Sequence, residues 1–519
     1  MQPDGTAGAE HAEDMAGPDY TFSESPQEPD AAVIKRLAAL PLLEYDRCRK
    51  PEAKQLGVQV STLDRQVEAA RRSASSAGGS EARAPEWSDE ALALRFSARH
   101  ADELRYVAAW GRWYRWTGTV WREDDTLRVF DLARSICREA AAQCEDGGTA
   151  PRIASAQTVA AVERLARADR RHAATADQWD GDPWLLNTPG GVVDLRTGTL
   201  REHQRNEYLT KTTSVAPAER ADCPRWLQFL DEITRGDADT IAFLQRAIGY
   251  SLTGDIREHA FFFLHGPGGN GKGVLLCSVG DMLGDYARAA LQSVVTVSRG
   301  DQHPTEIVAL RGARFVSVPE VEDGRAWAEA RLKGLTGGDV ISARVMRGDP
   351  FDFRPACKLW IVGNHRPVLR NPDPAMRRRM HLVPMTYVPP VPDLELPERL
   401  RGELPGILRW AIDGCFAWQR QGLDPPATVR AATDSYFAEQ DSIAAWIEER
   451  TERQRGAELG SRMAYIDWRG WATARGDDPG SERRFSAEME RYAARRKTNH
   501  GRVFLDLRLL STETGVWNG

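Results

Sequence analysis

A glycine-rich segment in the middle of the chain has the residue types that bind phosphate. The spacing from Gly266 through Gly271 to Lys272 is that of a phosphate-binding loop, in which backbone N–H groups converge on phosphate oxygens at a helix N-terminus. An apolar run, Ala260 to His265, precedes the loop. We expect Lys272 to reach the terminal phosphates of ATP. The candidate nucleotide-binding residues are Gly266, Pro267, Gly268, Gly269, Asn270, Gly271, Lys272, Gly273 and Val274.

Gly273 is the position at which this loop departs from the usual pattern. The lysine is normally followed by Ser or Thr, whose hydroxyl touches Mg²⁺. Without that hydroxyl, metal coordination has to rest on water and on carboxylates elsewhere in the chain. An ordinary glycine turn is the alternative interpretation, but the order of apolar run, glycine loop and helix favours nucleotide binding.

Polar side chains follow two later apolar runs. Glu320 and Glu322 close a run that begins at Arg314, and they are predicted to point the same way if the extended geometry continues. One would hold Mg²⁺ through water, and the other would polarise the attacking water. A solvated strand end is the alternative. A further run, 358–363, ends at Asn364, whose amide is suited to orienting water or sensing the terminal phosphate.

Basic residues follow in two groups. Two β-prone stretches joined between Arg347 and Pro350 predict a hairpin with a basic tip. Lys333, Arg344 and Arg347 are suited to salt-sensitive, sequence-neutral contacts with DNA phosphates, although a solvated hairpin is an equally good interpretation. Three arginines, 377–379, could supply an arginine finger to a neighbouring subunit's nucleotide.

In this order and spacing the motifs resemble the helicase portion of the phage/plasmid primase family, in superfamily 3 of the helicases, with poxvirus-type primase-helicase relatives. The matching segments are Gly-Pro-Gly-Gly-Asn-Gly-Lys, Pro-Glu-Val-Glu, Leu-Thr-Gly-Gly-Asp, Leu-Trp-Ile-Val-Gly-Asn-His and the arginine pair before Leu-Val-Pro. The resemblance covers roughly residues 87 to 510 and includes the segments 182–200 and 244–254.

The resemblance implies an AAA+-like motor with ATP and Mg²⁺ as cofactors, assembled into a hexameric ring that translocates 3′ to 5′ on single-stranded or forked DNA. It assigns phosphate binding to Lys272, Mg²⁺ and water activation to Glu320 and Glu322, the sensor role to Asn364, and the finger to Arg378 and Arg379. Residues 1–86 leave no room for a primer-synthesising domain, so we expect no primase activity and a separate primase as a possible partner.

A chain of 519 residues is too long for one hydrophobic core. The predicted fold class is multidomain α/β, with an AAA+-like P-loop motor between an α+β N-terminal domain and a C-terminal winged helix. The predicted parts are a disordered tail at 1–30, a helix-turn-helix-like segment at 31–72, a linker at 73–86, a helicase-associated N-terminal domain at 87–235, the ATPase domain at 236–390, a connector and helical lid at 391–430, and a winged-helix DNA-binding-like domain at 431–519.

The segment 31–72 predicts a helix-turn-helix. Gly57 would form the turn, Ser61 would cap the second helix, and Leu63 and Val67 would face the core. A plain helical hairpin that packs on or pairs with another subunit fits the pattern equally well.

Two further segments are candidates for nucleic-acid contact. Aromatic residues between 106 and 121 alternate around Gly118 and predict a β-hairpin. Its rings could stack bases, but filling the core of a small sheet is favoured. Helices followed by a β-ribbon at 441–508 predict a winged helix that contacts DNA, with a protein-docking winged helix as the alternative. The DNA candidates there are Arg483, Arg484, Arg496, Lys497 and Arg502.

The net charge of −6 requires any nucleic-acid contact to be local. We find no apolar run long enough to cross a bilayer, and the acidic start does not resemble a secretory signal. The expected location is therefore the cytoplasm of a bacterial host. The predicted function is an ATP-dependent DNA helicase in phage or plasmid replication. The alternative is a DNA-binding replication initiator or regulatory ATPase that assembles on DNA without unwinding it.

Overall fold

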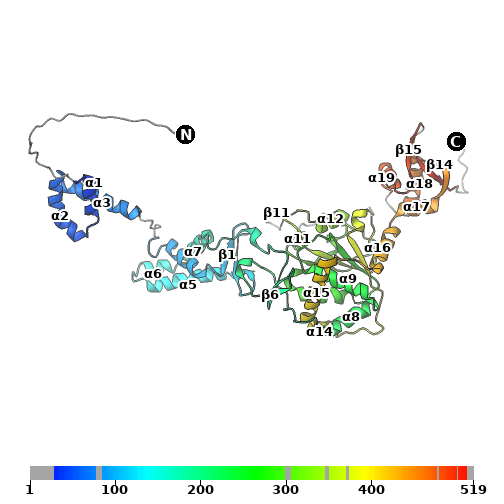
Figure 1. Cartoon of the computed structure of the whole chain (residues 1–519), viewed down its shortest axis with the longest axis horizontal. Coiled ribbons are helices and arrows are strands. Elements are labelled where there is room, and N and C mark those ends of the chain that lie inside the picture. The colour runs from blue at the N-terminus through cyan, green and yellow to red at the C-terminus, as the bar shows by residue number, and fades with distance from the viewer. Residues whose placement is uncertain are drawn as a thin grey trace, which may run out of the picture. The chain divides into compact units, whose positions relative to one another are not determined.

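The structure is a computed structural model of the chain (Figure 1), which describes residues 28–77, 84–297, 305–344, 350–369, 373–475, 479–499 and 501–510. The chain divides into two compact units, residues 1–91 and 92–519. Residues 1–27 of the predicted tail, 78–83 of the linker and Arg347 lie outside the described residues, as does the side chain of Arg344.

The first unit contains three helices, α1 Asp30–Ala38, α2 Leu42–Gln55 and α3 Val60–Ala77. Leu63 and Val67 are buried in their shared core, as predicted, and Gly57 lies between α2 and α3 with φ 66°. The predicted cap is wrong, because α3 begins at Val60 and Ser61 therefore lies inside its first turn.

The second unit begins with small α+β elements. Helix α4 Asp89–His100, whose first three residues belong to the first unit, precedes an antiparallel sheet of β1 Leu104–Val107, β2 Arg112–Trp116 and β3 Trp121–Glu123. Helices α5 Arg128–Gln143, α6 Thr149–Ile153 and α7 Ala156–Ala168 follow, and then a second sheet of β4 Leu185–Thr188, β5 Gly191–Asp194 and β6 Thr199–Arg201. The hairpin around Gly118 is confirmed, and its rings fill a core: Trp121 is fully buried and packs against Trp179 and Tyr208.

Five parallel strands form the central sheet of the described residues. They are β7 Phe261–His265, β8 Ala287–Ala289, β9 Phe315–Val318, β12 Lys358–Gly363 and β13 Met380–Pro384. Their order is β13-β7-β12-β9-β8. Because parallel strands bring their carboxyl ends to one edge, the segments that follow β7, β9 and β12 meet there.

Helices cover both faces of the sheet. Because the side chains of each strand alternate between the two faces, neighbouring residues of one strand join different cores. Phe262 and Leu264 join one core with α8 Pro224–Thr234, α9 Ala238–Ser251, α10 Lys272–Leu283, α14 Leu396–Gly402 and α15 Leu404–Gln421. Phe261 and Phe263 join the other core with α12 Glu329–Gly337, α13 Pro374–Arg377 and α16 Ala427–Glu439. The uninterrupted apolar run at 260–264 reflects this double burial.

The predicted hairpin after α12 is present. Its strands, β10 Ile341–Arg344 and β11 Pro350–Phe353, pair antiparallel. The short helix α11 Thr305–Val308 precedes β9 in the chain. The hairpin tip, 345–349, lies outside the described residues. Lys333 is on α12 rather than on the hairpin, and its ammonium forms an ion pair with Asp373.

The C-terminal elements are α17 Ser442–Arg450, β14 Thr451–Gly460, α18 Ser461–Ala474, α19 Glu482–Met489, β15 Arg495–Thr498 and β16 Gly501–Leu509. The strands form an antiparallel sheet in the order β14-β16-β15. Trp446, Trp468 and Phe485 pack in the core beneath it. Within the described part of the chain, no helix is long and apolar enough to cross a membrane.

Candidate nucleotide-binding site

The phosphate loop joins β7 to α10, and three of its glycines adopt backbone conformations that other residues rarely reach. Gly266, Gly269 and Gly271 have φ of 155°, 73° and 84°. A Cβ at Gly266 would collide with the carbonyl oxygen of Met385, and one at Gly271 would lie 2.8 Å from Ile233. Glycine is therefore required at these positions both for backbone angle and for space.

The Lys272 ammonium lies among four oxygen acceptors. Its Nζ donates to the carbonyl oxygens of Gly266 (2.7 Å) and Pro267 (2.8 Å), to Asn270 Oδ1 (2.9 Å) and to Asn364 Oδ1 (3.0 Å). The side chain is buried, and this burial lowers its pKa. An ammonium has three N–H donors, so four acceptors compete for it and one can be given up for a phosphate oxygen.

Asn364 connects Lys272 to Glu320. Its Oδ1 accepts from the lysine while its Nδ2 donates to Glu320 Oε1. The three residues come from α10, from the end of β12 and from two residues beyond β9, so the sheet edge brings them together from distant parts of the sequence. The amide holds the exposed carboxylate of Glu320 at this edge.

Glu322 does not join this group. The expectation that it points the same way as Glu320 fails because β9 already ends at Val318. Glu322 Oε2 instead accepts from Arg325 Nη2 at 2.6 Å and Nε at 3.0 Å, and this pairing holds the pKa of its carboxyl below the usual range. Between the two acids, Val321 is buried, and its N–H donates to the carbonyl of Val362.

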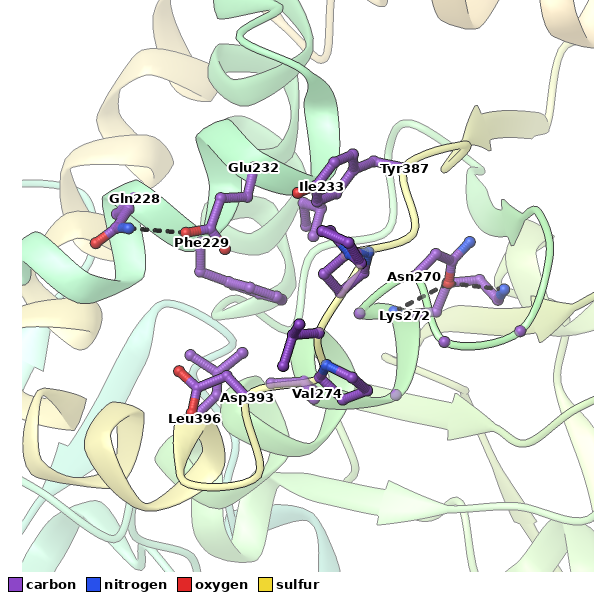
Figure 2. Close-up of a pocket in the computed structure, with 18 of the residues that line it drawn as sticks. Gln228, Phe229, Glu232, Ile233, Asn270, Lys272, Val274, Tyr387, Asp393 and Leu396 are labelled. Carbon is purple, nitrogen blue, oxygen red and sulfur yellow. Dashed lines mark hydrogen bonds between the residues drawn. The ribbon is translucent and has the colours of Figure 1, made fainter.

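A cavity of about 760 Å³ opens beside the phosphate loop (Figure 2). Residues Gly268 to Val274, Glu320 and Asn364 form its polar side. Phe229 and Ile233 of α8 line it close to Gly271, and Leu396 contributes a further apolar surface. The cavity therefore combines a polar side at the loop with apolar surfaces.

Sequence reasoning did not find two of the cavity walls. One is α8, whose lining residues are Arg225, Gln228, Phe229, Glu232 and Ile233. The other is the proline-rich segment after β13 together with the start of α14, with Tyr387, Pro389, Pro390, Val391, Pro392 and Asp393 from the segment and Leu396 and Arg399 from the helix. The only sequence signals were the amphipathic pattern of α8 and the proline run, and neither indicates a ligand by itself.

Gly273 lies on the cavity wall and is exposed. A Cβ built there would meet nothing within 4 Å. The missing hydroxyl therefore does not result from crowding, since a serine or threonine would fit.

The three arginines before β13 diverge. Arg377 Nη2 pairs with Asp434 Oδ1 at 2.7 Å, and Arg379 Nη1 donates to the carbonyl oxygen of Ala375 at 3.0 Å. The exposed guanidinium of Arg378 has no partner among the described residues. None of the three lines the cavity beside the loop.

The predicted C-terminal DNA contacts fall into two groups. Arg484 pairs with Glu488 at 3.0 Å, and Arg496 pairs with Glu458. Arg483 on α19 is exposed and has no ion pair within the described ranges; the same is true of Lys497 and Arg502, which lie directly opposite each other on β15 and β16.

The chain is similar to known proteins over several segments. Residues 93–235 match the family described as "D5 N terminal like", and residues 264–379 match a family of unknown function. The chain is 25% identical over 211 residues to "Putative helicase L207/L206" of Acanthamoeba polyphaga mimivirus and 26% identical over 261 residues to "Putative helicase 022R" of Frog virus 3. These alignments cover 40% and 46% of this chain but 22% and 27% of the relatives.

"Putative helicase 184R" of Invertebrate iridescent virus 6 is 24% identical over 318 residues, which are 53% of this chain and 33% of that protein. The chain thus spans a third or less of these relatives. The NrS-1 C terminal region is similar with a TM-score of 0.42 and 10% identity, covering 82% of this chain and 99% of that structure. The resemblance to the helicase portion of the phage/plasmid primase family is confirmed by the D5 N terminal-like region and the viral helicase relatives.

Proposed function

We propose that this chain is an ATP-dependent DNA helicase of phage or plasmid replication. The observation that carries the proposal is the contact series Lys272–Asn364–Glu320 beside a cavity of about 760 Å³. Homology to viral helicases supports a replicative helicase type of function.

ATP fits this site by the chemistry of its residues. Gly268 to Val274 offer N–H groups at a helix N-terminus, and Lys272 offers the charge for the terminal phosphates. Among the described residues no cluster of three or more His, Cys, Asp or Glu could hold a metal, so Mg²⁺ would rest on Glu320, phosphate oxygens and water. When bound, Mg²⁺ neutralises phosphate charge. Glu320 positions or activates the attacking water, and Asn364 holds Glu320 in place.

The order β13-β7-β12-β9-β8 supports an AAA+-like motor at 236–390, preceded by a helicase-associated domain at 87–235 and followed by a helical lid at 391–430. The helix and strand order of 442–510 supports a C-terminal winged helix. In a hexameric ring moving 3′ to 5′ on single-stranded DNA, the hairpin β10–β11 would contact the strand, and the unpartnered Arg378 would reach a neighbour's nucleotide.

The first test is ATP hydrolysis with and without single-stranded DNA, for the native chain and for Lys272→Ala. We expect DNA-stimulated turnover that disappears in the variant, followed by release of a strand from a forked duplex. A native chain that hydrolyses ATP without DNA stimulation and never unwinds a fork would contradict the helicase proposal.

Gly273 favours one second candidate, a DNA-bound ATPase switch that assembles on DNA without unwinding it. Because Gly273 has no side chain, the loop offers Mg²⁺ no hydroxyl ligand at this position. A switch would bind ATP, assemble on DNA and release no strand, so the forked-duplex assay separates the two functions.

A further inference from the structure

The proposed motor function leaves the three-helix unit at the N-terminus without a role. Helix α2 ends at Gln55, four residues follow, and α3 begins at Val60 (Figure 1). Gly57 takes the left-handed conformation inside that connection. Two helices joined by a short, glycine-containing turn and supported by a third helix form the arrangement in which a helix-turn-helix meets DNA.

The outer face of α2 has a row of cations. Arg47, Lys50 and Lys54 are spaced three and four residues apart, which places them on one side of the helix. All three are exposed, and none forms an ion pair with any described residue. Tyr45 and Ala53, on the opposite side, are buried in the core. Between residues 28 and 77 there are nine Lys and Arg against seven Asp and Glu, whereas the whole chain has a net charge of −6.

The first two turns of α3 present polar side chains to solvent. Ser61, Thr62, Arg65 and Gln66 are exposed, while Leu63 and Val67 face the core. The acid between them is already engaged, because Asp64 accepts from the Tyr45 hydroxyl at 2.8 Å and from Arg49 Nη1 at 3.1 Å. The exposed start of α3 therefore offers hydroxyl, guanidinium and amide groups, which are the groups that recognise base edges.

We propose that this unit is a second DNA-binding site, which binds duplex DNA. The row on α2 contacts phosphates, and the start of α3 enters the major groove, where Arg65 and Gln66 meet base edges. This site is separate from the nucleotide pocket and gives the helicase a means of holding duplex DNA at a chosen sequence.

The experiment measures binding of the full chain, without nucleotide, to blunt fluorescent duplexes between about 50 and 200 mM salt. The central variant combines Arg47→Gln, Lys50→Gln and Lys54→Gln. Since each phosphate contact contributes about 0.9 to the slope of log K against log salt, we expect the slope to fall by about 2 to 3. Lys35→Gln is the control for loss of a cation elsewhere on the unit and should leave the slope unchanged, because Lys35 is an exposed cation on α1 without an ion pair among the described residues.

Selection from a randomised duplex library tests the base contacts. We expect the native chain to enrich a sequence and Arg65→Ala to lose that enrichment, while its salt slope changes by about 1 or less. Single-stranded-DNA-stimulated hydrolysis should persist in all these variants, which shows that they fold.

Two outcomes would overturn the proposal. In one, the triple variant and Lys35→Gln show the same salt slope as the native chain. In the other, the triple variant keeps the duplex affinity of the native chain and the unit instead joins two copies of the chain: Leu42→Gln with Leu43→Gln, which change two leucines that are 75% and 77% exposed, lowers the mass in sedimentation.

Discussion

The candidate nucleotide pocket and the proposed DNA-contacting surfaces place charge in opposite ways. In the pocket, Lys272 is buried and bonded to four acceptors, and one of these, Asn364, also holds Glu320. On the surfaces, Lys497 and Arg502 are exposed and have no ion pair within the described ranges. Linked buried groups act as a unit, whereas separate exposed cations contribute independently. Changes in the pocket should therefore be large and non-additive, and changes on the surface small and additive.

Arg378 is exposed like the surface cations but is proposed to act in catalysis, so its removal should have the largest effect. We expect Arg378→Ala to lower DNA-stimulated turnover by about a thousand-fold, since an arginine finger supplies at least this much. Steady-state hydrolysis measures it. Arg377→Ala is the control, because Arg377 is already paired with Asp434. If both variants lose activity equally, the arginine run has a structural role instead.

Glu320 and Glu322 lie two residues apart but have different partners, since Glu320 accepts from Asn364 and Glu322 pairs with Arg325. Glu320→Gln should lower turnover by about a hundred-fold while ATP binding is retained, as expected when a catalytic carboxylate is lost. Glu322→Gln, which breaks only the pair with Arg325, should change turnover less than about three-fold. Nucleotide binding and hydrolysis are measured separately. A larger loss of turnover in Glu322→Gln would show that Glu322 also takes part in hydrolysis.

The surface side of the comparison predicts additive effects. Lys497→Gln and Arg502→Gln should each reduce the salt slope of DNA binding by about 1, and the double variant by about 2. Fluorescence anisotropy over a salt series measures this. Arg496→Gln should change the slope less, because Arg496 is paired with Glu458. A double variant no weaker than either single variant would show that the two residues do not contact DNA separately.

Gly273 tests whether the pocket tolerates an added ligand. Gly273→Ser should fold normally because a Cβ there meets nothing within 4 Å, and it should lower the Mg²⁺ concentration needed for half-maximal hydrolysis. We expect an effect of about three- to ten-fold, which corresponds to one added hydrogen bond or ligand contact. Gly268→Ser, also in open space on the loop, is the control. An unchanged Mg²⁺ dependence in Gly273→Ser would place the metal away from this position.

The smallest expected effect is that of His381 on the pH dependence of the folding stability. His381 on β13 packs between Phe243 and Phe262, and burial lowers its pKa to about 4. The unfolded chain takes up this proton near pH 6.5 and the folded chain only near pH 4, so stability is lost as pH falls through that interval. Thermal unfolding of His381→Phe should depend less on pH than that of the native chain. If the stability of the native chain and that of His381→Phe depend equally on pH, other titratable groups cause the loss of stability.

The sequence predicted the strand, loop and helix of the phosphate site because local spacing determines them. Asn364 and Glu320 could be predicted to meet because both follow strands, and parallel strands end at one edge. The direction of Glu322 could not be predicted, since it depends on β9 ending at Val318, and sequence patterns place the ends of elements poorly. The apolar wall from Phe229 was not foreseen because α8 joins the cavity only through tertiary packing.

Strand β13 connects two parts of the proposed site mechanically. At one end, the carbonyl oxygen of Arg379 accepts from the N–H of Phe261, and at the other the carbonyl oxygen of Met385 accepts from the side chain of Asn270 in the phosphate loop. Between these ends the strand is paired with β7 along its whole length. In the proposed ring, a force applied to the arginines by an adjoining subunit would therefore reach the loop through the main-chain hydrogen bonds of β13 and the side-chain hydrogen bond of Asn270, so that the occupancy of one candidate nucleotide pocket would be sensed in the next.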